Sequence, residues 1–378
     1  MNSTQYKFRC VRCGREIDSS NIIFRCPFCK GLLVIEYEKP VFMIDKDKPG
    51  IWRYRSLLPN FKEIISRGEG YTPIKRVGGV YIKNEKINPT GSYVDRASAL
   101  IASYISNFRV RDVVVEYEEV FSKSLAYYLS NLTNIRFCIE NEDLTNIPIN
   151  DLVYLMKIGE IEICGDKHIE NTLVLNYANP LTIEGLKTIV FELYEKKINV
   201  DYIVVPAKTG ILAYSLAKGM NDLEKSGLNT GYEIIATLPK NNPIPEILRE
   251  TRKIKVIEVP HREILESLKE LVSHRINTPP LSATAYYVAK NMSRAIAVIT
   301  AGYKPTAKIY RDKGLKKIIL ETIKRRGPMT AYEIWKENQK YSLRGIYKSI
   351  HSLIEQGYIC FETQTKRGRK VRVYDICS

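Results

Sequence analysis

The sequence lacks any apolar run approaching the ~18 to 20 residues that a membrane helix needs, which argues against a membrane protein. Its first ten residues, MNSTQYKFRC, have no apolar core, so we expect no secretory signal and a cytoplasmic location. Internal repeats and low-complexity segments are also absent. A chain of 378 residues with 44% hydrophobic residues is predicted to form two or three globular domains.

Acidic residues are scarce relative to basic ones: 42 Asp and Glu stand against 58 Lys and Arg, for a net charge of +16. From Arg311 to Ser378 we count 16 basic against 7 acidic residues, which is +9 in 68 residues. A merely solvated Lys-rich surface would not concentrate the charge in this way. The tail is therefore predicted to be a separate domain that binds nucleic acid.

Eight cysteines without a signal peptide predict a reducing compartment, where clustered cysteines bind metal more often than they form disulfides. Four of them form two C-x2-C pairs separated by a 12-residue loop, and two such turns build a closed structural Zn²⁺ site. The predicted ligands are Cys10, Cys13, Cys26 and Cys29. The scattered Cys138, Cys164, Cys360 and Cys377 are expected to be small buried residues without a role.

Between Trp52 and Lys304, short β-branched runs alternate with amphipathic helical stretches, as in DVVVEYE, SKSLAYYLSNL and IRFCIE. This alternation is typical of an α/β fold with a parallel sheet. In such folds ligands bind beyond the carboxyl ends of the strands, in the loops that open helices. The candidate ligand site is therefore sought in those loops.

Several motifs in this region, together with the N-terminal ribbon, resemble threonine synthase, a pyridoxal-phosphate enzyme of fold type II (tryptophan-synthase-β-like). They are IWRYRSLLP at Ile51, GEGYTPI at Gly68, KNEKINPTGSYVDR at Lys83 and NPLTIEGLKT at Asn179. The resemblance spans about Phe8 to Lys304 and implies a two-subdomain core with parallel sheets, commonly dimeric. The expected domains are a zinc ribbon at 1–40, the core at 41–306 and the basic domain at 311–378.

The resemblance also implies three cofactor-binding segments, and each is altered here. Val94 occupies the position of the lysine that forms the Schiff base, and valine can neither form an imine nor shuttle a proton. A Ser-Ser-Gly-Asn loop of the family aligns with Tyr117–Val120, and the phosphate loop aligns with Pro206–Leu212, where one glycine remains. We therefore expect a pseudoenzyme with no enzymatic activity, in which pyridoxal phosphate is absent or not covalently bound.

A metabolite could still bind in this region, and an amino-acid-like effector such as threonine or phosphohomoserine is expected by analogy. The candidate pocket residues are Thr90, Ser92, Lys208, Thr209, Gly210 and Thr300. Thr300 matches the threonine that the family places beside the ring nitrogen of the cofactor. Two alternatives stay open, because Thr and Ser near helix starts are often only caps and Lys208 is equally well explained as a solvated surface lysine.

The basic tail has the pattern of a winged helix-turn-helix. A first helix over Lys313–Arg326 ends at Gly327, Thr330 caps a second helix with Glu333 completing a capping box, and a third starts near Ser342. Two β runs, YICFETQT and KVRVYDI, follow and are joined by the basic turn KRGR. This ending is similar to that of many archaeal and bacterial transcription regulators.

In such a domain the third helix enters the major groove of double-stranded DNA and the hairpin follows the phosphates. The predicted DNA-binding residues are Ser342, Arg344, Lys348, His351, Lys366, Arg367, Arg369, Lys370 and Arg372. Tyr347 is expected to pack against the hairpin and Trp335 to lie in the core. Winged helices also serve as protein-interaction modules, which remains an alternative.

The favoured hypothesis is a homodimeric transcriptional regulator that senses a metabolite with an inactive threonine synthase-like core and binds an operator with its winged helix. Two alternatives are a working pyridoxal-phosphate lyase with an accessory DNA-binding domain and a constitutive, architectural DNA-binding protein.

Overall fold

The computed structural model describes residues 6–18, 21–165, 172–251, 253–302, 312–355, 358–366 and 369–377. The chain divides into two compact units, Met1–Ala307 and Lys308–Ser378, which are described separately below. Residues 303–311, where the expected core and basic domain meet, lie outside the described residues. Across the described part of the chain, no helix is both long and apolar enough to cross a membrane.

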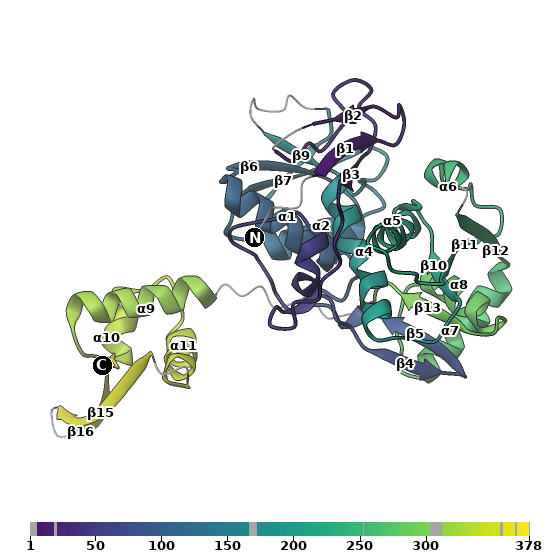
Figure 1. Ribbon diagram of the computed structural model, residues 1–378. Helices are drawn as coiled ribbons and strands as arrows, with labels where there is room; N and C mark the ends of the chain where they lie inside the picture. The colour runs from purple at the N-terminus through teal and green to yellow at the C-terminus, as the bar shows by residue number, and fades with distance from the viewer. Residues whose placement is uncertain are drawn as a thin grey trace. The chain divides into compact units, whose positions relative to one another are not determined.

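The N-terminal unit begins with a small antiparallel sheet in the order β2-β1-β3 (Figure 1). Its strands are β1 (Tyr6–Cys10), β2 (Glu16–Ile17) and β3 (Leu33–Tyr37). Strand β3 contacts helix α4 (Pro180–Glu195), where the Tyr37 hydroxyl donates a 2.5 Å hydrogen bond to Glu184 Oε2. The small sheet is thereby attached to the larger part of the unit through a buried polar contact.

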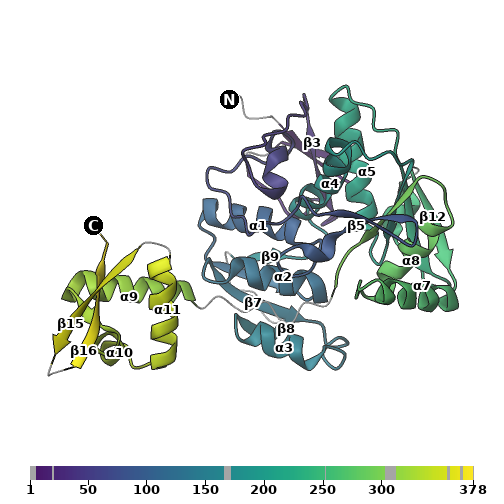
Figure 2. The same cartoon turned by 90° about the horizontal axis from the view of Figure 1, so that it is seen from below.

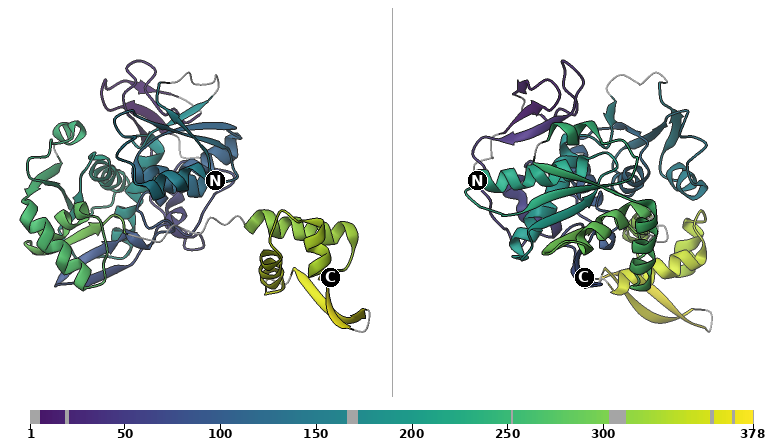
Figure 3. Two further views of the ribbon diagram at one scale, coloured as in Figure 1. Left: turned by 180° about the vertical axis from the view of Figure 1, so that it is seen from behind. Right: turned by 90° about the vertical axis from the view of Figure 1, so that its right-hand side faces the viewer.

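The rest of this unit contains two sheets built around parallel strands, which Figure 3 shows as separate groups of strands. The four-stranded sheet, in the order β8-β7-β6-β9, is all parallel and contains β6 (Asp112–Glu116), β7 (Asn134–Ile139), β8 (Glu160–Ile163) and β9 (Leu173–Leu175). The six-stranded sheet, in the order β12-β11-β10-β13-β5-β4, contains β4 (Ile74–Val77), β5 (Val80–Asn84), β10 (Tyr202–Pro206), β11 (Glu233–Pro239), β12 (Ile254–Val259) and β13 (Ala295–Ile299). Only β4 pairs antiparallel in it. The predicted α/β class with parallel sheets is confirmed.

Helices surround both sheets, as parallel strands buried on both faces require. They are α1 (Asp95–Phe108), α2 (Glu119–Leu129), α3 (Ile149–Met156), α4, α5 (Ile211–Lys225), α6 (Glu246–Glu250), α7 (His261–Ser273) and α8 (Pro280–Lys290), with 3₁₀ turns at Gly50–Leu57 and Glu85–Ile87. The central strand β10 shows the pattern, because Ile203, Val204 and Val205 are all fully buried.

Four charged side chains from β5, the following 3₁₀ turn, α1 and α4 are fully buried together. The Lys83 ammonium donates to Glu192 Oε2 at 2.5 Å, and Arg96 Nε donates to Glu85 Oε2 at 2.7 Å. Arg96 also bonds the other oxygen of Glu192. Every charge in the group therefore faces an opposite charge, which is the condition under which burial of an ion is tolerated.

The C-terminal unit contains three helices and a small antiparallel sheet (Figure 2). The elements are α9 (Asp312–Arg326), β14 (Met329–Thr330), α10 (Ala331–Glu337), α11 (Leu343–Glu355), β15 (Ile359–Lys366) and β16 (Arg369–Ile376), with the sheet order β14-β16-β15. The predicted capping box is confirmed: Thr330 Oγ1 accepts from Glu333 N at 3.2 Å, and Glu333 accepts from Thr330 N at 2.7 Å. The short strand β14 was not predicted.

The four scattered cysteines differ from the expectation. They form two disulfides, Cys138–Cys164 and Cys360–Cys377, across sequence separations of 26 and 17 residues. Each bond joins neighbouring strands: Cys138 lies in β7 and Cys164 follows β8, while Cys360 lies in β15 and Cys377 follows β16. The Cα atoms of the two pairs lie 4.9 and 5.1 Å apart because neighbouring strands pair in one particular register. The sequence alone does not give that register, so the pairs could not be predicted from it.

Candidate functional site

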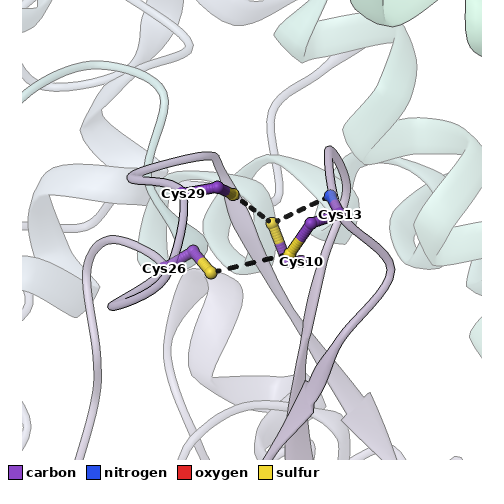
Figure 4. A group of neighbouring side chains, drawn as sticks. All are labelled: Cys10, Cys13, Cys26 and Cys29. Carbon is purple, nitrogen blue, oxygen red and sulfur yellow. Dashed lines mark hydrogen bonds between the residues drawn. The ribbon is translucent and has the colours of Figure 1, made fainter.

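The four clustered cysteines come together in the small N-terminal sheet (Figure 4). All four Sγ atoms lie within 4.8 Å of one another, with Cys10 Sγ 3.5 Å from Cys29 Sγ and Cys13 Sγ 3.8 Å from Cys26 Sγ. A tetrahedral ion with Zn–S bonds of ~2.3 Å would hold its sulfurs ~3.8 Å apart. The four thiols thus have the spacing and the chemistry to bind a metal ion.

The two cysteine turns share one backbone geometry. Gly14 N donates to Cys10 O at 3.0 Å, and Lys30 N donates to Cys26 O at 2.9 Å. Gly14 and Lys30, each directly after the second cysteine of its pair, both have positive φ, 70° and 59°. Each C-x2-C pair is therefore one tight turn that points both thiols to the same side, as the spacing predicts.

A second candidate site lies at the carboxyl ends of the parallel strands, where α1 begins. Val94 precedes α1 and is 0% exposed, and its carbonyl accepts hydrogen bonds from Ala97 N and Ser98 N at 2.9 and 3.0 Å. The preceding loop is held against the end of β13, because Tyr93 N donates to Thr300 O at 2.9 Å. The aliphatic side chain of Val94 is thus enclosed at the start of the helix.

Near the start of α1, two side-chain contacts connect the loops at the ends of the six-stranded and the four-stranded sheet. Lys208, after β10, has its Nζ 3.8 Å from Oε1 of Glu118, which follows β6. The hydroxyls of Tyr93 and Tyr177 lie 2.7 Å apart, and Tyr177 follows β9. Burial, followed by the negative charge of Glu118, raises the pKa of Tyr93 above its usual value, which keeps the phenol neutral. Neither tyrosine was singled out from the sequence.

Three of the predicted pocket residues, Thr90, Ser92 and Thr300, lie near the start of α1, and their hydroxyls have partners. Thr90 Oγ1 donates to Asp95 Oδ1, Ser92 Oγ accepts from Val94 N at 3.2 Å, and Thr300 Oγ1 lies 2.9 Å from Ser282 Oγ. Burial raises the pKa of Asp95 to about 6. This geometry agrees with the alternative that Thr90 and Ser92 act as helix-start residues.

The other three predicted pocket residues precede α5. Lys208 is exposed over 69% of its side chain, and Thr209 Oγ1 accepts from Ile211 N at 3.4 Å. Gly210 has φ +79°, and a Cβ there would lie 2.7 Å from Ile247 Cγ2, so both the conformation and the space require glycine. Gly210 thus directly precedes α5 in a left-handed backbone conformation.

A pyridoxal-phosphate imine does not fit the residues at the start of α1. Position 94 offers no amine, and Glu118 turns its carboxylate to Phe121 N at 2.9 Å, capping α2. The same carboxylate lies 3.8 Å from Lys208 Nζ and pairs with the cation of the turn before α5. Two other lysines, Lys83 and Lys123, are paired with carboxylates, Glu192 at 2.5 Å and Asp151 at 2.9 Å.

The third candidate site is on the C-terminal unit. The buried side of α11 carries Ile346, Ile350 and Leu353, as its periodicity predicts. Five of the predicted DNA-binding residues, Ser342, Arg344, Lys348 and His351 at α11 and Arg372 on β16, are exposed. Lys366, Arg369 and Lys370 belong to the hairpin strands β15 and β16, and Arg367 lies outside the described residues.

Two aromatic residues of this unit can be compared with the expectation. Tyr347 is 51% exposed, and it lines one pocket together with Val371, Arg372 and Tyr374 of the hairpin strand β16. Trp335 is partly buried against the core and donates its Nε1 hydrogen to Tyr341 O at 3.1 Å.

Comparison with known proteins identifies relatives of this chain. The chain is 29% identical over 287 residues to a threonine synthase from Methanocaldococcus jannaschii, which is 65% of this chain and 68% of that protein. It is 26% identical over 264 residues to a threonine synthase from Methanosarcina acetivorans, covering 59% of this chain and 62% of the relative. No family model matches the chain.

Several solved structures of enzymes have a similar fold. Serine racemase from Dictyostelium discoideum superposes with a TM-score of 0.52 at 17% identity, over 62% of this chain and 93% of that one. A pyridoxal 5′-phosphate-dependent aspartate racemase gives 0.51 at 14% identity, over 63% and 92%. The chain is therefore similar in sequence to threonine synthases, and it shares the fold of these solved structures.

These findings contradict the prediction that the chain is not an enzyme, because the relatives are threonine synthases and the structural neighbours are enzymes. The prediction relied mainly on Val94, whereas the similarity extends over 287 residues. A valine excludes an imine at its own position, but it does not exclude chemistry by other groups at this end of the sheets.

Proposed function

We propose that this chain is a threonine synthase-like protein whose C-terminal unit is a winged helix-turn-helix domain that binds double-stranded DNA. The observation that carries the proposal is the exposed positive charge along α11 and β16. Arg344, Lys348 and Arg372 are exposed there, within a tail of net charge +9 by the count of 16 basic and 7 acidic residues.

The order of elements supports this proposal. Three helices are followed by the β15–β16 hairpin, and α11 buries one apolar stripe while its basic residues stay in solvent. A helix of this kind can lie in the major groove, ~12 Å wide, with the hairpin beside it along the phosphates. The Arg344 side chain would read base edges, while Arg372 would neutralise a phosphate.

The N-terminal unit would serve this function as a dimerisation and metabolite-binding module, which makes the protein a transcriptional regulator. A dimer would present two winged helices to half-sites about one helical turn, ~34 Å, apart. An amino-acid-like effector would bind near Thr300 and Lys208, where the ends of the two sheets meet. The effector can shift DNA binding only if it binds two arrangements of the dimer with different affinity.

The four cysteines would hold one structural Zn²⁺, because a site closed by four thiolates leaves no position for water. Pyridoxal phosphate, in contrast, would not be attached covalently at the start of α1, since Val94 has no amine there. Borohydride treatment of the protein with one equivalent of pyridoxal phosphate tests the second statement: mass spectrometry of the digest should find no lysine that carries the reduced adduct stoichiometrically.

Enzymatic activity of the threonine synthase type is the second candidate function, and the sequence similarity to two threonine synthases favours it. It would require pyridoxal phosphate held without an imine at residue 94, or an amine supplied from elsewhere in the chain. Threonine formation from O-phosphohomoserine by the purified protein would establish this function. The assay is independent of DNA binding, so both functions can be present together.

DNA binding is tested with the full chain and fluorescent duplexes. Affinity should fall steeply with salt, with a slope of roughly −0.9 per phosphate neutralised. Arg372→Ala should weaken binding to all sequences alike, whereas Arg344→Ala should reduce the preference among sequences selected from a random library. Arg294→Ala, which removes an exposed cation of the N-terminal unit paired with Asp201, is the matched control and should bind as the wild type does.

Absence of binding at low salt would refute the proposal. Equal and sequence-independent effects of Arg344→Ala and Arg372→Ala would instead refute the assignment of α11 to the major groove.

A further inference from the structure

A groove of about 660 Å³ opens in the C-terminal unit between the start of α10, helix α11 and strand β16. Its walls are tyrosines and branched apolar residues: Tyr332, Tyr347, Tyr374, Ile350 and Ile354. Tyr374 is buried, but Tyr332 and Tyr347 are 57% and 51% exposed. These two rings do not contribute to the core of the unit. Their exposed position along the groove suits contact with a binding partner.

The charges around the groove favour an anionic partner. Arg372 lines it with its guanidinium 4.7 Å from the centre of the Phe361 ring, which orients the side chain on the hairpin. On α11, Tyr347 lies next to Lys348 and one turn after Arg344, and both cations are exposed. The acidic residue of the lining, Glu333, turns its carboxylate to the N and Oγ1 atoms of Thr330 at 2.7 and 2.8 Å.

We propose that this groove receives the sugar–phosphate backbone of one strand of duplex DNA, with the hydroxyls of Tyr332 and Tyr347 donating hydrogen bonds to phosphate oxygens. The inference rests on the proposed DNA binding and adds two residues that charge alone does not identify. Tyrosine hydroxyls are among the groups that contact DNA phosphates, and the apolar walls suit the carbon-rich face of deoxyribose. Arg372 supplies the opposing charge.

The experiment compares conservative variants of the full chain. Tyr332→Phe and Tyr347→Phe remove one hydroxyl each and keep the ring. Tyr358→Phe is the matched control, because Tyr358 is 57% exposed in the same unit and does not line the groove. Fluorescence anisotropy with a duplex of about 25 base pairs measures Kd over a range of salt. Contacts to phosphate do not depend on sequence, so any duplex serves.

Each groove variant should bind about fivefold more weakly, as expected for a lost hydrogen bond of about 1 kcal/mol. The dependence on salt should not change, because a neutral hydroxyl releases no counterion. Arg372→Ala, in contrast, should reduce the slope by about one. Tyr358→Phe should bind as the wild type does, and thermal unfolding should be the same in all tyrosine variants.

Wild-type affinity of Tyr332→Phe and Tyr347→Phe, together with weaker binding by Arg372→Ala, would overturn the groove assignment and leave DNA binding in place. An equal loss in Tyr358→Phe would overturn it as well, because the loss would then not be specific to the groove. If the wild-type protein does not bind DNA at all, both this inference and the proposed function fail.

Discussion

The two units of this protein use charge in opposite ways. In the N-terminal unit, Lys83 and Arg96 are fully buried and paired with Glu85 and Glu192. In the C-terminal unit, Arg344, Lys348 and Arg372 are exposed on α11 and β16. A buried ion must be paired to be tolerated, so the first set is committed to the fold, whereas the second stays available to a partner. Burial therefore decides whether a basic residue is paired within the fold or remains available to bind a partner.

The largest effect is expected at the cysteine cluster, where one metal ion would hold four thiolates together. Removal of the metal by a strong chelator should unfold the small N-terminal sheet, because structural zinc in such modules contributes on the order of 10 kcal/mol. Elemental analysis should find one zinc per chain, and Cys26→Ser should lower this content. An unchanged denaturation curve after chelation would show that the four thiols hold no structural metal.

The next largest effect is expected for the buried charged group of Lys83, Glu85, Arg96 and Glu192. Glu192→Ala leaves Lys83 and Arg96 without one of their counter-charges and should lower the free energy of unfolding by about 3 to 5 kcal/mol. Urea denaturation measures the change. Glu192→Gln removes the charge but keeps the volume, so it should destabilise the protein nearly as much as Glu192→Ala. A loss much smaller than that of the alanine variant would contradict the electrostatic explanation.

Two buried acids should give opposite dependences on pH. Burial opposes the charge of Glu192, but Arg96 and Lys83 lower its pKa from 4.5 to about 2, so its contribution to stability is present above pH 4.5 and is lost as pH falls toward 2. Burial raises the pKa of Asp95 from 3.8 to about 6, so its contribution is present below pH 3.8 and is lost as pH rises through 6. Thermal unfolding of Glu192→Gln and Asp95→Asn across pH 3 to 7 should therefore diverge from the wild type in different windows.

The smallest effect is expected for an exposed pair in the same unit. Lys269 and Glu266 lie 2.8 Å apart with side chains 62% and 56% exposed. Lys269→Ala should leave the urea denaturation curve within error of the wild type, since water and salt screen such pairs. A loss as large as that of Glu192→Ala would remove the distinction between buried and exposed charge on which the comparison depends.

Local features could be predicted well. The segment DVVVEYE contains β6, SKSLAYYLSNL overlaps most of α2, and the capping box at Thr330 has the expected bonds. The spacing of the four clustered cysteines also predicted that they would meet. Similarity to threonine synthases then corrected the inference from Val94, because one side chain says little about the remaining groups at the end of the sheets.

The sequence by itself determined the alternation of strands and helices, the cysteine turns and the basic tail, because each depends on residues a few positions apart and on backbone periodicity. Only the tertiary structure decided the contacts between distant segments. These are the Lys208–Glu118 pair between the ends of the two sheets, the two disulfides and the groove between Tyr332 and Tyr347. Such contacts depend on how strands align and helices pack, which no local pattern encodes.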